Sequence, residues 1–180
     1  GVARFGDLFA PRQALALAVL GRLVRNLSSS FPPQMDKGLG EAITASLALA
    51  VDRQADSLSS LATWAAGGEF TRSTFTRQAL AIVWDFAECC PLADASGNWD
   101  GATEWVSKAI EANAQCANNP GTVVQASATE HPLPNDAANA IVTDPPYYDA
   151  VPYADLSEFF YVWMRRTLAG HDIGAFKHAE

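Results

Sequence analysis

The feature that most constrains the fold of this 180-residue chain is a change of pattern near residue 118. Before that point, apolar residues recur at steps of three and four, which is the period of an amphipathic helix. After it, two short β-rich runs at 122–126 and 140–143 alternate with polar loops and precede a final helix. Such alternation is typical of a parallel α/β sheet. We therefore expect an α/β fold, with a helical segment or insertion over residues 1–118 and part of a sheet over residues 119–180.

Five stretches carry the apolar periodicity and the end signals of helices. A proline at an opening position, a Gly-Gly pair and a proline after a last turn mark several of their ends. Their aromatic and aliphatic side chains are expected to form a core, and none has the spacing of a cofactor-binding motif. The predicted helices cover residues 11–27, 41–66, 73–89, 100–117 and a stretch that starts near Tyr153.

The charge of the chain limits its partners. The formal net charge is −8, whereas phosphate binding is dominated by Lys and Arg. We therefore expect no broad nucleic-acid-binding face, and any contact with DNA must be local or come from sequence outside this chain. The modest basic cluster of Arg12, Arg22 and Arg25 is expected to be a solvated helix face rather than a phosphate site.

Cysteine usage and hydropathy indicate a cytoplasmic protein. The three cysteines have neither metal-like spacing nor the pattern of a disulfide framework, so no metal site is expected. No apolar stretch approaches the roughly 20 residues needed to span a bilayer, and the amino terminus lacks a signal sequence. The chain begins at Gly1 without a methionine and ends soon after a helix, so we expect a fragment of a larger protein.

An acid, two prolines and a tyrosine directly follow the second β-rich run, as Asp144-Pro145-Pro146-Tyr147. The carboxyl end of a strand is where open α/β sheets hold their ligands. From ordinary residue usage, this tetrapeptide arises by chance in a chain of this length at about one in a thousand. It is therefore the strongest functional signal in the sequence.

These residue types suit methyl transfer to an exocyclic amine such as that of adenine. The amino nitrogen is a poor nucleophile because its lone pair is delocalised into the ring, so a catalyst must orient it. The carboxylate of Asp144 can accept one amino hydrogen and the carbonyl of Pro145 the other. Pro145 and Pro146 restrict the orientation of that carbonyl, because each proline fixes its own φ and lacks an N–H donor. Such preorganised acceptors stabilise charge that appears in the transition state.

Aromatic residues near the motif can hold the target base. Tyr147 can stack on a base that has left its helix, and Tyr148 and Tyr153 can extend this wall. Asp149 and Asp155 could line the pocket that holds the target base, although Asp155 equally suits the first turn of a helix. The methyl donor is expected to be S-adenosylmethionine, whose sulfonium makes the methyl group electrophilic without a metal.

Other interpretations of the motif remain open. Asp144-Pro145-Pro146 can form a rigid turn between a strand and a loop. Pro145-Pro146-Tyr147-Tyr148 also satisfies the Pro-Pro-x-Tyr pattern that WW domains bind in extended form. Within methyl transfer, an amine of RNA or a glutamine side chain of a protein presents a planar target similar to adenine. The motif alone does not separate these substrates.

Stretches over most of the chain resemble one family. The closest is Thr143-Asp144-Pro145-Pro146-Tyr147-Tyr148-Asp149, and the others are 153–157, 159–163, 9–13, 47–53 and 77–88. The family that they resemble comprises the large adenine-specific DNA methyltransferases of bacteria and archaea that carry an extra N-terminal region of uncharacterised function.

This resemblance implies a Rossmann-like class I methyltransferase fold, S-adenosylmethionine as cofactor, adenine in DNA as substrate, and Asp144 to Tyr147 as the catalytic loop. The Gly-rich cofactor loop of the family has no counterpart here and is expected in a missing upstream portion of the domain. The family often has an acidic residue after the strand that corresponds to 122–126, where this chain has Ser127-Ala128. The resemblance thus makes Ser127, Ala128 and Asp144 the expected cofactor-binding residues, and the chain by itself is expected to be inactive.

Overall fold

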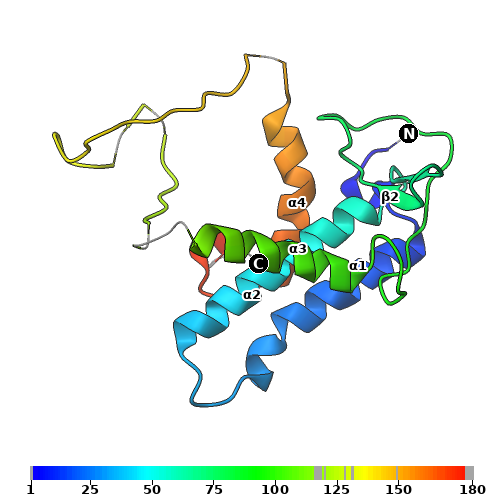
Figure 1. The fold of residues 1–180 in the computed structure, drawn as a ribbon, viewed down its shortest axis with the longest axis horizontal. Helices are drawn as coiled ribbons and strands as arrows, with labels where there is room; N and C mark the ends of the chain where they lie inside the picture. The colour runs from blue at the N-terminus through cyan, green and yellow to red at the C-terminus, as the bar shows by residue number, and fades with distance from the viewer. Residues whose placement is uncertain are drawn as a thin grey trace.

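A computed structural model describes residues 2–115, 119, 121–127, 129–130, 132–148 and 150–176. These residues contain four α-helices and one two-stranded antiparallel sheet (Figure 1). The helices are α1 (Pro11–Arg25), α2 (Lys37–Ser57), α3 (Trp99–Ala114) and α4 (Tyr153–Leu168). The strands are β1 (Thr63–Ala65) and β2 (Phe70–Arg72), and short 3-10 helices lie at η1 (Phe5–Leu8), η2 (Leu27–Ser30) and η3 (Gly174–Phe176). The described part of the chain is therefore mixed α/β and rich in helix.

Local side-chain signals explain where the first three helices begin. Pro11 opens α1, and Gln13 Oε1 accepts a hydrogen bond from the Ala10 N–H at 2.8 Å. Asp36 caps α2 by accepting from the Leu39 N–H at 2.9 Å. Asn98 caps α3 by accepting from the Gly101 N–H at 2.9 Å, so this helix begins at Trp99, one residue before the predicted range. Each cap satisfies a backbone donor that has no partner within its helix.

The core forms where α2 packs against α1, α3 and α4, and where α1 also packs against α4. Its aromatic centre joins the N-terminal region to α4. The ring of Phe159 on α4 lies 5.6 Å from Phe9 and 5.0 Å from Phe75, and Trp163 lies 5.3 Å from Phe9. Such aromatic pairs contribute about 0.5–1.5 kcal/mol beyond the burial of their area. The helix that follows the Asp-Pro-Pro-Tyr motif is thus part of the same core as α1 and α2.

The predicted helix at 73–89 is wrong, because this stretch is irregular in the structure. Three of its backbone N–H groups donate to distant residues instead of along a helix. The Thr74 N–H donates to the Asp56 carbonyl at 2.7 Å, the Phe75 N–H donates to Asp56 Oδ1 at 3.2 Å, and the Ala87 N–H donates to the Ala62 carbonyl at 2.8 Å. Side-chain and tertiary partners of this kind compete with helical hydrogen bonds.

The second predicted helix is shorter at its carboxyl end than expected. Helix α2 ends at Ser57, and the residues assigned to its last turns enter the β1–β2 hairpin, in which Thr63 pairs with Arg72 and Ala65 with Phe70. Gly67 and Gly68 lie in the turn of this hairpin and do not end a helix. At Gly68 a Cβ atom would lie 2.6 Å from the ring of Phe70, so a larger residue there would have to displace this partly exposed ring.

The chain between α3 and α4 runs away from the helical body, as Figure 1 shows for its described residues. The β-rich runs at 122–126 and 140–143 are exposed and are not paired as strands. A strand is stable only when its backbone groups bond to a neighbouring strand, and the described residues offer these runs none. A parallel, Rossmann-like sheet is accordingly not found among the described residues.

Candidate functional site

The Asp-Pro-Pro-Tyr motif lies on the extended segment that precedes α4. Asp144, Pro145, Pro146 and Tyr147 are all exposed, and they belong to neither a helix nor a strand. Tyr147 is 70% exposed and Tyr148 is 99% exposed. No part of the described helical body covers the motif, so the stacking wall and the oriented carboxylate are not assembled from these residues alone.

The other predicted site residues are also separate from one another. Tyr153 opens α4, with its N–H bonded to the Val151 carbonyl at 2.9 Å. The Ser127 hydroxyl shares a hydrogen bond of 2.8 Å with Thr129 Oγ1. Ala128 and Asp149 lie outside the described residues. Among those described, no hydrogen bond links one predicted site residue to another.

Helix α4 ties the motif to the helical body. It begins six residues after Tyr147 and carries Phe159 and Trp163, which are both buried against Phe9. Burial of an aromatic side chain of this size contributes about 1.5–3 kcal/mol. The carboxyl side of the motif segment is therefore joined to a firmly packed element.

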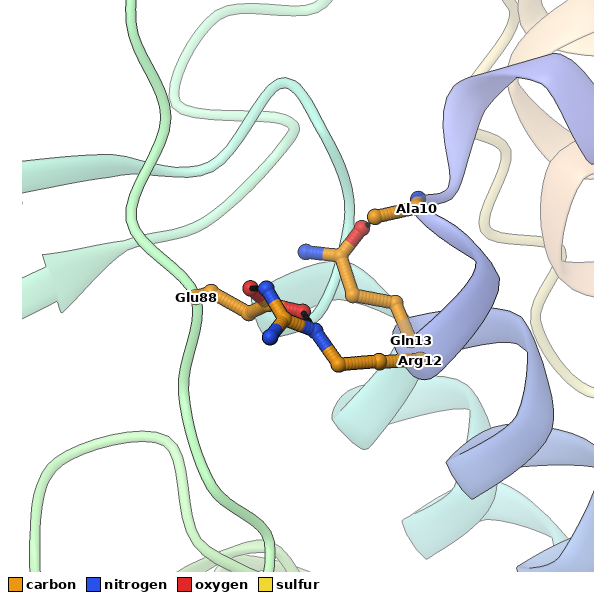
Figure 2. Close-up of polar contacts among 4 residues, drawn as sticks. All are labelled: Ala10, Arg12, Gln13 and Glu88. Atoms are coloured by element: carbon orange, nitrogen blue, oxygen red, sulfur yellow. Dashed lines mark hydrogen bonds and ion pairs between the residues drawn. The ribbon is translucent and has the colours of Figure 1, made fainter.

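Two stretches that are far apart in the sequence meet at the amino end of α1. Arg12 donates to Glu88 through Nε at 3.2 Å and through a terminal nitrogen at 2.6 Å, although the residues are 76 positions apart (Figure 2). The Arg12 side chain is 84% exposed and that of Glu88 is 28% exposed. An exposed pair contributes only about 0–1 kcal/mol, so its main effect is to hold the irregular 73–98 segment beside α1. Arg12 thus pairs with a carboxylate, which the sequence did not predict.

Cys89 lies next to this ion pair and has a structural environment. Its sulfur shares a hydrogen bond of 3.0 Å with Thr71 Oγ1 and donates to the Ser57 carbonyl at 3.5 Å. Burial raises the pKa of the Cys89 thiol, so this thiol keeps its proton at neutral pH. Within the described residues, no group of three or more His, Cys, Asp or Glu side chains is placed to hold a metal ion.

Asp52 is a buried carboxyl group on α2. It is only 8% exposed on α2, and its Oδ1 atom has no hydrogen-bond partner among the described residues. Burial raises the pKa of Asp52 to about 8. The only signal in the sequence is its place among Ala48, Val51 and Ala55 on the apolar face of α2.

Comparisons with known proteins add no identification. No protein-family model matches the chain, and neither the curated proteins nor the solved structures provide a match. In the described part of the chain, no helix combines the length and the apolar character needed to cross a membrane.

Proposed function

We propose that this chain is the part of a larger enzyme that carries the catalytic loop for transfer of a methyl group from S-adenosylmethionine to the exocyclic amine of adenine in DNA. The observation that carries the proposal is the placement of Asp144-Pro145-Pro146-Tyr147 between an apolar β-rich run and a packed helix. Ligand sites of open α/β sheets occupy this position between a strand and the next helix.

Within this proposal, Asp144, Pro145 and Tyr147 each have one role. Asp144 accepts a hydrogen bond from the target amine, and the Pro145 carbonyl accepts the second. The amine lone pair would then face the methyl group of the cofactor. The N–C bond would form as the C–S bond breaks, the cofactor would leave as S-adenosylhomocysteine with the sulfur electron pair, and the surplus amine proton would pass to solvent. Tyr147 provides a flat face for the base, which replaces the neighbours that the base had in its helix. The sulfonium of the cofactor makes its methyl group electrophilic.

The exposed β-rich runs support the part of the proposal that concerns strands outside this chain. Val123 and Val142 are 98% and 95% exposed, and Ile141 and Val124 are also exposed. Fully burying a Val or Ile side chain contributes about 1.5–3 kcal/mol. Pairing in a sheet that covers these side chains would therefore stabilise both runs. In our proposal, upstream sequence of the larger protein supplies neighbouring strands and the cofactor loop, and a Rossmann-like parallel sheet then holds the motif.

The test is a comparison of substrates with the larger protein that contains this chain. Purified protein is incubated with S-adenosylmethionine labelled in its methyl group and with DNA, RNA or protein. We expect label in DNA, recovered as adenine methylated on its amino group. Label only in RNA would favour the RNA alternative, label in protein glutamine would favour the protein alternative, and either result would contradict the DNA proposal.

A second candidate function follows from the exposure of Pro145-Pro146-Tyr147-Tyr148. The segment is exposed and lies outside the helices and strands, so it is accessible to a WW domain, which binds Pro-Pro-x-Tyr ligands in extended form. The two functions depend on different tyrosines, since the WW pattern needs Tyr148 whereas our catalytic proposal needs Tyr147. When a WW domain is titrated into the chain, binding should therefore be lost in Tyr148→Ala and kept in Tyr147→Ala. Absence of binding to the unaltered chain would remove this candidate.

A further inference from the structure

Three arginines from two helices line one cavity of about 370 Å³. Arg22 and Arg25 lie in the last turn of α1, and Arg166 lies in the last turn of α4. The volume is near the lower end of the range for small-molecule pockets, about 300–1,000 Å³. The described lining contains no carboxylate, and its other members are a glycine and apolar residues such as Leu15 and Trp163. The cavity is therefore positively charged, although the chain has a net charge of −8.

Close packing of α1 against α4 brings these arginines together. Gly21 is buried between the two helices, where a Cβ atom would lie 3.0 Å from Thr167 Oγ1. Arg25 Nη1 donates to the Arg166 carbonyl at 3.4 Å, and His171 Nε2 donates to the Arg25 carbonyl at 2.8 Å. These contacts hold the end of α1 beside the end of α4, so residues that are 141 positions apart share one cavity.

The positive charges of the cavity are not paired with carboxylates. The ion pairs among the described residues join other basic groups, and Arg12, which the sequence grouped with Arg22 and Arg25, is bound to Glu88. The one hydrogen bond that a guanidinium of the cavity donates within the described part of the chain is that of Arg25. Because a guanidinium has five N–H donors, most donors of this cluster are open to a ligand or to water.

The ends of the two helices account for only part of this charge. A basic side chain in the last turn stabilises a helix, because the carboxyl end of a helix carries about −0.5 elementary charge. Two such ends balance about one of the three positive charges. The remaining charge of about +2 favours a ligand with several negative charges.

The number and placement of the donors suit a phosphate group. Arginine binds both carboxylate and phosphate through paired N–H donors. A carboxylate has two oxygens in one plane, whereas a terminal phosphate has three acceptor oxygens that point in different directions. Guanidinium groups that approach from two helices can therefore bind one phosphate together.

We propose that Arg22, Arg25 and Arg166 bind a phosphate group in this cavity. A small polyphosphate and the backbone of a nucleic acid both present this group, and the experiment below distinguishes the two sources. The site lies on the helical body and does not depend on the methyl-transfer proposal.

The experiment titrates the chain at low ionic strength with inorganic pyrophosphate and with a single-stranded oligodeoxynucleotide, followed by calorimetry. We expect pyrophosphate to bind with a Kd of about 1 mM or tighter, and added salt should weaken binding because it screens exposed charges. Citrate carries a similar charge on three separate carboxylates and should bind more weakly. Tighter binding of the oligonucleotide than of pyrophosphate would assign the site to a nucleic-acid backbone, and the reverse order would assign it to a small phosphate compound.

Neighbouring arginines of α4 provide the matched control. Arg22→Gln and Arg166→Gln each remove one guanidinium and should weaken phosphate binding about tenfold or more, the usual effect of losing a hydrogen bond to a charged group. Arg165→Gln makes the same change of charge at an exposed residue that does not line the cavity, so it should change binding little. The proposal is overturned if neither phosphate ligand shows saturable binding, if citrate binds as tightly as pyrophosphate, or if Arg165→Gln weakens binding as much as Arg166→Gln.

Discussion

Asp52 makes the stability of this protein depend on pH in a direction opposite to that of a salt-bridged carboxylate. Burial raises its pKa from the ordinary value of 3.8 to about 8, so the native carboxyl group keeps its proton at neutral pH. In the unfolded chain the same group is ionised above about pH 4. The unfolded state then binds fewer protons than the native state, and the free energy of unfolding falls as the pH rises between these two pKa values.

The size of the effect follows from the length of this pH window. The free energy of unfolding changes by about 1.4 kcal/mol per pH unit for one proton, so a rise from about pH 4 to about pH 7 removes about 4 kcal/mol. Asp52→Asn keeps the shape of the side chain and cannot ionise. This variant should match the unaltered protein near pH 4 and exceed its stability by about 4 kcal/mol near pH 7.

Urea denaturation followed by far-ultraviolet circular dichroism measures this difference at several pH values. The comparison of the two proteins at each pH cancels the contribution of the other titrating groups. Asp94→Asn is the control, because Asp94 is exposed in the loop before α3, and its effect should stay within about 0.5 kcal/mol. If the stability difference between Asp52→Asn and the unaltered protein is the same at pH 4 and pH 7, Asp52 is not held neutral by burial.

Two further predictions concern the core and the loop before α3. Phe159→Ala should lower the free energy of unfolding by about 3–5 kcal/mol, because the ring is buried between Phe9 and Phe75. Glu158→Ala changes an exposed neighbour and is the control. Equal urea midpoints for the two variants would contradict the packing described. Gly97→Ala should cost about 1–3 kcal/mol, since Gly97 has φ +80 and its Cβ would lie 2.6 Å from Cys89 Sγ. Gly6→Ala, where nothing lies within 4 Å of the added Cβ, should change the thermal midpoint little, and a similar shift in both variants would refute the steric argument.

The helices that the sequence predicted well have their start and stop signals in their own residues. Pro11 opens α1 as expected, and α4 begins at Tyr153 and carries Arg165 and Arg166 in its last turn. The stretch at 73–89 has an equally good apolar period, but its backbone donors bond to Asp56 and Ala62, which are distant in sequence. Periodicity describes which face is apolar and does not reveal such long-range partners.

The residue types of the candidate site can be recognised in the sequence, and their chemistry stays a prediction, whereas the assembly of the site depends on strands that pair with its flanking runs. Asp144 and its neighbours are recognisable as a set of residue types, but the expected sheet requires strands that pair with the runs at 122–126 and 140–143, and the described residues supply none. The contact between Arg12 and Glu88 was likewise hidden, because its partners are 76 residues apart and each also suits a solvated surface. The sequence does not show the burial of Asp52 either, because burial depends on how other helices pack around α2.

Methyl transfer by the larger protein, compared between the unaltered sequence and Asp144→Ala, tests the central proposal most directly. Asp144 is exposed and lies outside the helices and strands, so its replacement should leave the thermal midpoint unchanged. Because the carboxylate orients the amine, we expect Asp144→Ala to lower the rate of methyl transfer to DNA by about 100-fold or more. The control variant Asp94→Ala should keep full activity. Turnover by Asp144→Ala at the unaltered rate would contradict the assignment of this loop as the catalytic one.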